Sequence, residues 1–531
     1  MSSIIRQKVG NHIYLYESFS YRNEEGKPRN RRTPIGKPDP ITGASIYKPE
    51  YIARMAEAGT PVETATSSNA TFTTANIRQS TIQEIGAFHL YRELAERSGL
   101  LSVLKAALPH HWEEVFTLAA YLVTSGDPFA YCEDWLAATE TFDVGRMTSQ
   151  RISELLKAIT PEYRDEFYSL WCSLRGELEY LALDITSVSS YSELIDSVEW
   201  GYNRDGEQLQ QINICMLMGY QSRLPIYQTV YSGSLKDVSA LQKTIGTFHA
   251  LSEGKPIVAI MDKGFCSTKN VNSMLTGDNR TRFLIAVPFT GKFALTQVEN
   301  ERDTIDTLTN TIVAGADSMR AVTRLHRWSE EHQPYTHIYY NAKKANGIRE
   351  SLYAYVATLK KYAEKNPKKC ENDPKYTKYL KIRLSQESPS GYCVELIGSA
   401  VFAELKTAGW MVLLSNRISD SKEAIRIYRE KDICEKGFQR LKNCLDLGRL
   451  RVHSEESMQS KVFIGFIALI LLSCIHQTMA DKKLYSRMSM KKLLLSLSGV
   501  KAQTVRGVRI LFPLTKEQRT IYEAFAISLP A

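Results

Sequence analysis

The chain has 531 residues, a length that favours more than one domain, and its 43% hydrophobic and 24% charged residues are typical of a soluble globular protein. Its most apolar run, residues 462–475, is short for a membrane span, which argues against a membrane partner and predicts a buried helix. The formal net charge of +9 favours a polyanionic partner, but an ordinary basic protein has the same balance.

Residues 1–40 are expected to form a small basic β unit. Between Arg22 and Lys37 the sequence has six basic residues against two acids. Such a hairpin can bind phosphate groups or lie as a charged turn in solvent, and the sequence leaves both open. Residues 41–80 are rich in Thr, Ser, Ala and Pro without periodicity, so we expect a linker with one short helix near 51–58.

Residues 81–177 are expected to form a helical DNA-binding or dimerisation domain. Apolar residues recur at helical spacing in two stretches, 85–94 and 115–123. Pro109 and Pro161 separate the predicted helices.

The pattern changes after residue 178 to short β-rich runs, which predicts an α/β fold. Three strands, a helix and a further strand follow one another, the order of a ribonuclease-H-like core. We assign residues 178–289 and 406–480 to this catalytic core. Its strands are expected at 180–185, 211–218, 226–231, 257–261, 283–287 and 410–416, and its helices near 238–252, 422–445 and 458–478.

Residues 290–405 interrupt the core as an insertion domain. From Lys343 to Arg383 there are twelve Lys and Arg against four Asp and Glu, with tyrosines between them. Basic residues pair with phosphates and aromatic rings stack on exposed bases, although a solvated helical insertion has the same composition. The DNA-binding candidates in this run are Lys360, Lys361, Lys365, Lys368 and Lys369.

The end of the chain and the cysteines give weaker signals. Residues 481–531 are expected to form a helical, basic tail. The nine cysteines include no CxxC pair, which argues against a zinc ribbon and suits a reducing cytoplasm. There is no GxxxxGK[ST] loop, so no nucleotide cofactor is expected. His326, His332 and His337 are too loosely spaced to indicate a zinc site.

Three acids stand where a metal-dependent site needs them. Asp184 and Asp262 each close an apolar run, although a single strand-terminal Asp is more often a turn former. Tyr428, Lys431, Glu435 and Lys442 follow one another at intervals of 3, 4 and 7, which places them on one face of a helix. A charged surface helix with i,i+4 pairs would give the same spacing.

These residues resemble a known family. Tyr-x2-Arg-x3-Glu-x6-Lys is the signature of a large group of bacterial DDE insertion-sequence transposases, and Lys431 stands here where that group usually has Arg. Four flanking blocks resemble the group in the same order over about 178–480. They are LeuAspIleThrSerValSerSerTyrSer, TyrSerGlySerLeuLysAspValSerAlaLeu, MetAspLysGlyPheCysSer and ArgLeuArgValHisSerGlu-x-x-Met.

The resemblance implies a transposase that cleaves transposon ends by metal-dependent hydrolysis and joins the 3′ ends to target DNA. Asp184, Asp262 and Glu435 would hold two Mg²⁺ ions, with Mn²⁺ as a substitute. The expected partners are double-stranded DNA, as terminal inverted repeats and target, and a second copy in a homodimer, in a bacterial cytoplasm near the nucleoid.

The resemblance also implies a β-rich insertion, in which Trp328 would stack on a flipped base, although a tryptophan at such a position is more often part of a core. Because a phenol and an ammonium suit phosphate oxygens better than Mg²⁺, we expect Tyr428, Lys431 and Lys442 to contact DNA. Repulsion between the clustered acids predicts a site that is poorly ordered without metal.

Two other functions share these features. A ribonuclease-H-like nuclease would have the same acids and would cut without rejoining. A domesticated, non-catalytic DNA-binding protein would be expected to have lost one acid, and all three are present.

Overall fold

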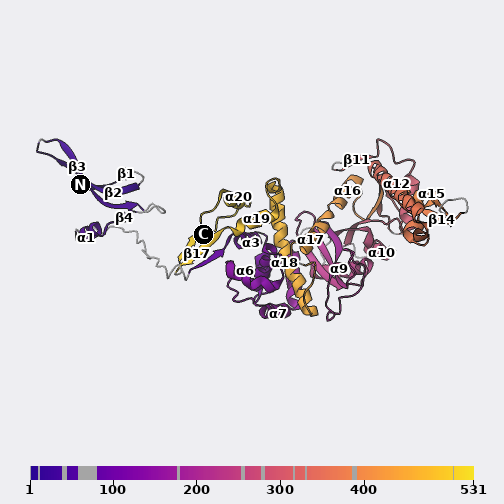
Figure 1. Ribbon diagram of the computed structural model, residues 1–531, viewed down its shortest axis with the longest axis horizontal. Coiled ribbons are helices and arrows are strands. Elements are labelled where there is room, and N and C mark those ends of the chain that lie inside the picture. The colour runs from indigo at the N-terminus through magenta and orange to yellow at the C-terminus, as the bar shows by residue number, and fades with distance from the viewer. Residues whose placement is uncertain are drawn as a thin grey trace. The chain divides into compact units, whose positions relative to one another are not determined.

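The computed structural model divides the chain into two compact units, Met1–Thr81 with Thr504–Val508, and Ile82–Gln503 with Arg509–Ala531. Figure 1 shows the elements of both units along the chain. The structure describes residues 2–9, 12–24, 26–38, 45–57, 80–175, 180–252, 257–276, 281–314, 317–328, 330, 332–385, 391–445, 447–505 and 508–530.

The smaller unit is built around an antiparallel sheet in the order β1-β2-β3-β4. Leu15, Ile35 and Tyr51 form its small core. The fourth strand and the following helix fall within residues 41–80, and residues 58–79 of the predicted linker lie outside the described residues. The elements are β1 (Ser2–Val9), β2 (His12–Arg22), β3 (Pro28–Pro38), β4 (Ser45–Tyr47) and α1 (Pro49–Glu57).

Helices follow in the larger unit, as the apolar spacing predicts. The Thr148 side chain caps α7, and Pro161 stands in the first turn of α8, where its missing N–H costs nothing. After a short strand, β5 (Thr81–Glu84), the elements are α3 (Gly86–Arg97), α4 (Leu100–Ala107), α5 (Trp112–Thr124), η1 (Phe129–Tyr131), α6 (Cys132–Ala138), α7 (Ser149–Ala158) and α8 (Pro161–Leu174).

A nine-stranded sheet forms the centre of the larger unit, in the order β11-β12-β13-β16-β10-β9-β6-β7-β8. Strands β6, β9 and β10 are parallel neighbours, and the remaining pairs are antiparallel. The fold is therefore mixed α/β, as predicted. The first part contains β6 (Tyr180–Ser189), β7 (Gln211–Gly219), β8 (Pro225–Ser232), α9 (Asp237–Leu251), β9 (Ile257–Met261), η2 (Lys263–Phe265), α10 (Thr268–Thr276) and β10 (Thr281–Ala286).

The insertion differs from the expected β-rich domain. Its first half adds β11, β12 and β13 to the central sheet, because β13 pairs along its whole length with the core strand β16. Its second half is mainly helical, with one hairpin and its own small core. The elements of the insertion are α11 (Lys292–Glu301), β11 (Thr311–Ala314), β12 (Asp317–Leu325), β13 (Tyr335–Tyr340), α12 (Ala342–Lys365), α13 (Pro367–Cys370), α14 (Pro374–Thr377), β14 (Leu380–Leu384), β15 (Tyr392–Leu396) and α15 (Gly398–Leu405), and the core resumes with β16 (Trp410–Ser415).

The single helix expected over 422–445 is wrong: two helices, α16 (Ser421–Arg429) and α17 (Asp432–Asn443), stand there. Between them the Lys431 and Cys434 amides bond three residues back, to Tyr428 and Lys431. Helix α16 packs on β9 and on β11 to β13, whereas α17 packs on β6 and β7. Because these strands lie on different parts of the sheet, the chain has to turn between the helices.

Helix α18 (Glu455–Asp481) is the long apolar helix that the sequence predicts. It is long and apolar enough to cross a membrane, but 78% of its most apolar window is buried inside the protein. It packs against α5, α7 and α17 and so joins the helical segment to the sheet in one core (Figure 1). The remaining elements are η3 (Leu484–Ser486), α19 (Met490–Ser498), β17 (Lys501–Val505), β18 (Val508–Leu511) and α20 (Lys516–Ala524).

Candidate active site

Two of the predicted acids lie side by side where the parallel pairing of β6 with β9 ends, Asp184 within β6 and Asp262 directly after β9. Leu183 of β6 pairs in register with Met261 of β9, and each is followed by an aspartate. The Asp184 carboxylate accepts a hydrogen bond from the Ile185 amide at 2.9 Å. The Asp262 carboxylate accepts one from the Lys263 amide at 2.7 Å, which starts the turn η2. The parallel register therefore brings both carboxylates to one edge of the sheet.

The third acid, Glu435, lies in the first turn of α17, and its side chain is 55% exposed. Cys434, the residue before Glu435, fixes α17 to the strand that carries Asp184. Its thiol donates a hydrogen bond to the Ala182 carbonyl at 3.1 Å. The helix packing thus carries Glu435 towards the two aspartates from a distant part of the sequence.

Lys431 links the acids. Its ammonium lies 3.5 Å from Asp262 Oδ2 and 3.6 Å from Glu435 Oε1, and its side chain is only 15% exposed. Burial alone would lower the pKa of Lys431, but the charges of Asp262, Asp184 and Glu435 together raise it above its ordinary value. In the metal-free protein, one cation therefore offsets the repulsion among the three acids.

The two aspartates differ in their electrostatics. Burial raises the pKa of Asp184 to about 6, although the Ile185 amide and Lys431 oppose the shift. Burial also acts to raise the pKa of Asp262, but Lys431, the Lys263 amide and the Tyr428 hydroxyl outweigh it and hold that pKa below its ordinary value. Asp262 is therefore the better-stabilised anion of the pair.

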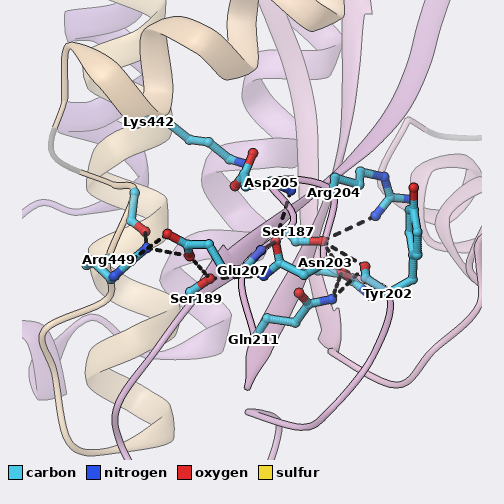
Figure 2. Close-up of polar contacts among 12 residues, drawn as sticks. Ser187, Ser189, Tyr202, Asn203, Arg204, Asp205, Glu207, Gln211, Lys442 and Arg449 are labelled. Atoms are coloured by element: carbon cyan, nitrogen blue, oxygen red, sulfur yellow. Dashed lines mark hydrogen bonds and ion pairs between the residues drawn. The ribbon is translucent and has the colours of Figure 1, made fainter. Parts of the chain in front are cut away.

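Tyr428 and Lys442, for which DNA contacts stay a prediction, each contact an acid of the chain. The Tyr428 hydroxyl donates to Asp262 Oδ1 at 3.0 Å, so it orients an acid. The Lys442 ammonium donates to Asp205 Oδ2 at 2.5 Å, and its side chain is 13% exposed (Figure 2). Because of the helix break, residues on α16 and α17 do not share one continuous face.

In the part of the chain that the structure describes, no hydrogen bond or ion pair joins the insertion candidates to the three acids. The Trp328 indole N–H donates to Asn272 Oδ1 at 2.5 Å, and its ring packs against Phe293 and His326 beside an open pocket. Lys360 pairs with Glu364 on α12 at 3.7 Å. The other four lysines, Lys361, Lys365, Lys368 and Lys369, are exposed.

A metal would find a suitable donor set here, because three carboxylates supply the oxygen ligands that Mg²⁺ prefers. Among the described residues, no three Asp, Glu, His or Cys side chains are already close enough together to hold an ion. Lys431 stands between Asp262 and Glu435, so metal binding would require its ammonium to withdraw from their oxygens.

Sequence reasoning missed the polar residues that brace the site. Asp205 and Glu207, between β6 and β7, pair with Lys442 and Arg449. No local motif marks either acid. The only signal was Arg449, which stands in the last of the blocks that resemble the family.

A family model described as the transposase DDE domain matches residues 176–471. This range contains all three acids and covers more than half of the chain. The chain belongs to the transposase DDE domain family. Asp184, Asp262 and Glu435 therefore lie within a transposase domain. Transposases are enzymes that act on nucleic acid.

Two other comparisons add little. Among solved structures, the chain is similar to a piggyBac transposase in a synaptic complex with hairpin DNA, at 11% identity and a TM-score of 0.38, covering 72% of this chain and 69% of that one. That likeness is too distant to support an argument about the site. No curated protein matches the chain.

Proposed function

We propose that this protein is a metal-dependent DNA transposase that binds transposon ends, hydrolyses the DNA there and joins the freed 3′ ends to target DNA. The observation that carries the proposal is that Lys431 lies within ion-pair distance of Asp262 and Glu435 and feels the charge of Asp184, in a domain of the transposase family. Water and then the 3′-hydroxyl would attack phosphorus in the same site, so no covalent enzyme intermediate is needed.

In this proposal Asp184, Asp262 and Glu435 hold two Mg²⁺ ions, for which Mn²⁺ substitutes. When bound, such a pair of ions activates the attacking oxygen and stabilises the leaving one. The Tyr428 hydroxyl keeps Asp262 oriented through its hydrogen bond. Lys431, once released from the carboxylates, is a point charge beside the reacting phosphate.

The proposed partners are double-stranded DNA, as terminal inverted repeats and target, and a second copy of the chain in the DNA complex. We place the protein in a bacterial cytoplasm, acting near the nucleoid, and assign it to the insertion-sequence group whose signature it carries with Lys431 in place of Arg. No nucleotide cofactor enters the reaction.

The decisive experiment uses the inverted repeats that flank the gene in its source genome as labelled DNA ends, with a supercoiled plasmid as target. Wild-type protein with Mg²⁺ or Mn²⁺ should cleave the ends and insert them into the plasmid. Asp184→Asn, Asp262→Asn and Glu435→Gln should each abolish both steps while end binding persists, because only the metal ligands are lost.

Glu430→Gln is the matched control, since Glu430 is an exposed acid at the same helix junction. Cleavage without plasmid insertion would favour a nuclease that does not rejoin. End binding without any cleavage would favour a domesticated DNA-binding protein. Near wild-type strand transfer by one acid variant would remove that acid from the ligand set.

A further inference from the structure

The segment between β6 and β7 exposes unusually large side chains. The Trp200 ring is 63% exposed and the Tyr202 ring is 83% exposed, on a stretch that leads back into the fully buried strand β7. We call residues 199–211 the aromatic loop. Exposed aromatic rings that lie together mark interaction sites more often than isolated apolar residues do.

The backbone of the aromatic loop is held firmly although its rings are exposed. The Tyr202 carbonyl accepts hydrogen bonds from Gln211 Nε2 at 2.9 Å and from the Ser187 hydroxyl at 3.3 Å (Figure 2). Glu199 and Gln211 exchange two backbone hydrogen bonds, at 3.0 and 2.9 Å. An aromatic ring on a fixed backbone loses little conformational entropy when it binds.

Close packing at Gly201 adds to this rigidity. A Cβ atom at Gly201, between the two aromatic residues, would stand 1.9 Å from the Gly233 carbonyl oxygen. Only a glycine allows the loop to approach the turn after β8 so closely. The backbone position of both aromatic residues is therefore set by the fold.

The acids of the aromatic loop are all occupied. Asp205 pairs with Lys442 at 2.5 Å, and Glu207 pairs with Arg449 at 2.6 Å and accepts from the Ser189 hydroxyl (Figure 2). Glu199 accepts from the hydroxyls of the turn after β8. Two of the three loop carboxylates are thus neutralised by cations, which reduces the repulsion that a polyanion would meet at this loop.

The loop also lies beside the catalytic acids. Ser187, which holds the Tyr202 carbonyl, follows Asp184 by three residues on the same strand, or about 10 Å at the usual rise of a β-strand. Arg204 donates to the same hydroxyl at 3.4 Å, and its charge acts to lower the pKa of Asp184. The aromatic loop is therefore attached to the strand that carries Asp184.

We propose that the aromatic loop is a stacking platform for unpaired DNA: the Tyr202 ring, with Trp200 near it, stacks on a base of the strand that enters the catalytic site. This inference rests on the proposed function, because it needs DNA at Asp184. Stacking on an aromatic ring tolerates any base, so the platform holds the strand without reading its sequence. Asp205 and Glu207 are ion-paired and Arg204 lies nearby, so the charges of the loop favour DNA over a basic or a purely apolar protein partner.

The test compares two DNA probes, a short duplex that ends in a single-stranded thymidine tail and the same duplex fully paired. Wild-type protein should bind the tailed probe more tightly. Tyr202→Ala should weaken binding to the tailed probe by about 5- to 150-fold, the range for loss of one base stack, and leave the paired probe unchanged. Tyr202→Phe should retain the preference, because the ring is kept.

Tyr131→Ala is the matched control, since Tyr131 is an exposed tyrosine (59%) on η1 in the helical segment. Fluorescence of 2-aminopurine placed in the tail should be quenched by wild type and Tyr202→Phe but not by Tyr202→Ala. Equal loss for both probes, or an unchanged preference in Tyr202→Ala, would overturn the platform. If Tyr202→Ala instead changed only self-association, the loop would be a protein interface and the inference would be wrong.

The two proposals fail separately. Absence of metal-dependent cleavage by wild type would defeat the transposase proposal. Normal cleavage by wild type together with an unchanged tail preference in Tyr202→Ala would defeat only the platform. Because the Tyr202 ring is exposed and its carbonyl makes the supporting bonds, alanine at this position leaves those backbone contacts intact.

Discussion

Lys431 governs the charge of the candidate site. It lies at the junction of two helices, within ion-pair distance of Asp262 and Glu435, and it is the most buried member of that group. A divalent ion would need the same carboxylate oxygens. Lys431 and a divalent ion would therefore compete for the same carboxylate oxygens. The ion pairs with Lys431 also hold Asp262 and Glu435 in place.

Replacing Lys431 with methionine should raise the affinity for Mn²⁺ in the absence of DNA. Two partly exposed ion pairs are lost, each worth roughly 0.5–1 kcal/mol, so the gain should be about 5- to 30-fold. Calorimetric titration of Mn²⁺ measures it. Lys436→Met is the control, because Lys436 pairs with Asp432 at 2.9 Å and not with the site. Unchanged or weaker Mn²⁺ binding would show that Lys431 does not compete with the ion.

The buried side chain of His337 should make the stability of the fold depend on pH. It is fully buried on β13, where its ring lies 2.8 Å from the Thr323 hydroxyl and 3.0 Å from the Ile418 carbonyl. Burial lowers the pKa of His337 to about 4. The folded state thus keeps the ring neutral at pH values where the unfolded chain has already bound a proton.

The stabilising contribution of neutral His337 should be complete above the unfolded pKa of about 6.5 and be lost as the pH falls towards 4, by up to about 3 kcal/mol. Urea unfolding at a series of pH values should show a shallower acid loss for His337→Gln than for wild type. His453→Gln, at an exposed position, should follow the wild-type curve. Identical slopes for all three proteins would contradict a buried neutral His337.

At the scale of elements, α12 and α13 form a basic surface separate from the site. Lys361, Lys365, Lys368 and Lys369 are exposed, whereas Lys360 is paired with Glu364. The tyrosines between them are partly used in packing: Tyr362 stacks on Tyr376 with ring centroids 5.8 Å apart. The lysines therefore remain better candidates for DNA contacts than the rings do.

Changing these four lysines to glutamine should weaken DNA binding and flatten its salt dependence. Each phosphate contact that is lost removes about 0.9 from the slope of log affinity against log salt. Anisotropy titrations over a range of salt give the slope. Lys360→Gln should change it less, and Lys482→Gln with Lys483→Gln, just beyond α18, should leave it as in wild type. An unaltered slope in the fourfold variant would mean that the surface is merely solvated.

At the scale of the whole molecule, the chemistry and the basic hairpin belong to different compact units. The larger unit contains all three acids, and the smaller unit presents Arg29, Arg31 and Arg32 exposed on β3. A separate unit with its own core can be removed without opening the core of the other.

A chain that begins at Ser80 should therefore keep Mn²⁺ binding and the cooperative thermal unfolding of the larger unit. Its DNA affinity should fall because phosphate contacts are lost, by roughly tenfold for each 1.4 kcal/mol of binding free energy that those contacts supply. Gel-shift titration of both chains gives the ratio. Changing Arg29, Arg31 and Arg32 to glutamine in the full chain should reproduce part of the loss. Equal affinity of the long and short chains would leave the hairpin without a role in DNA binding.

The mixed α/β fold, the strands that carry Asp184 and Asp262, and the long apolar helix could be predicted from the amino-acid sequence. These are local properties: a run of apolar residues that ends in an acid needs no knowledge of its neighbours. The flanking motifs indicated a DDE transposase, which the match over residues 176–471 supports, whereas the insertion-sequence group stays a prediction. The roles of the three acids as metal ligands stay predictions.

The contacts that hold the site together could not be predicted from the sequence, because they join residues that are far apart along the chain. Lys442 and Asp205 are 237 positions apart in the sequence, and no periodicity connects them. The break between α16 and α17 arises because the two helices pack on different strands, although their residues alone would continue one helix. The pairing of β13 with β16, the placing of Lys431 among the acids and the exposed ring of Tyr202 likewise depend on contacts between distant segments.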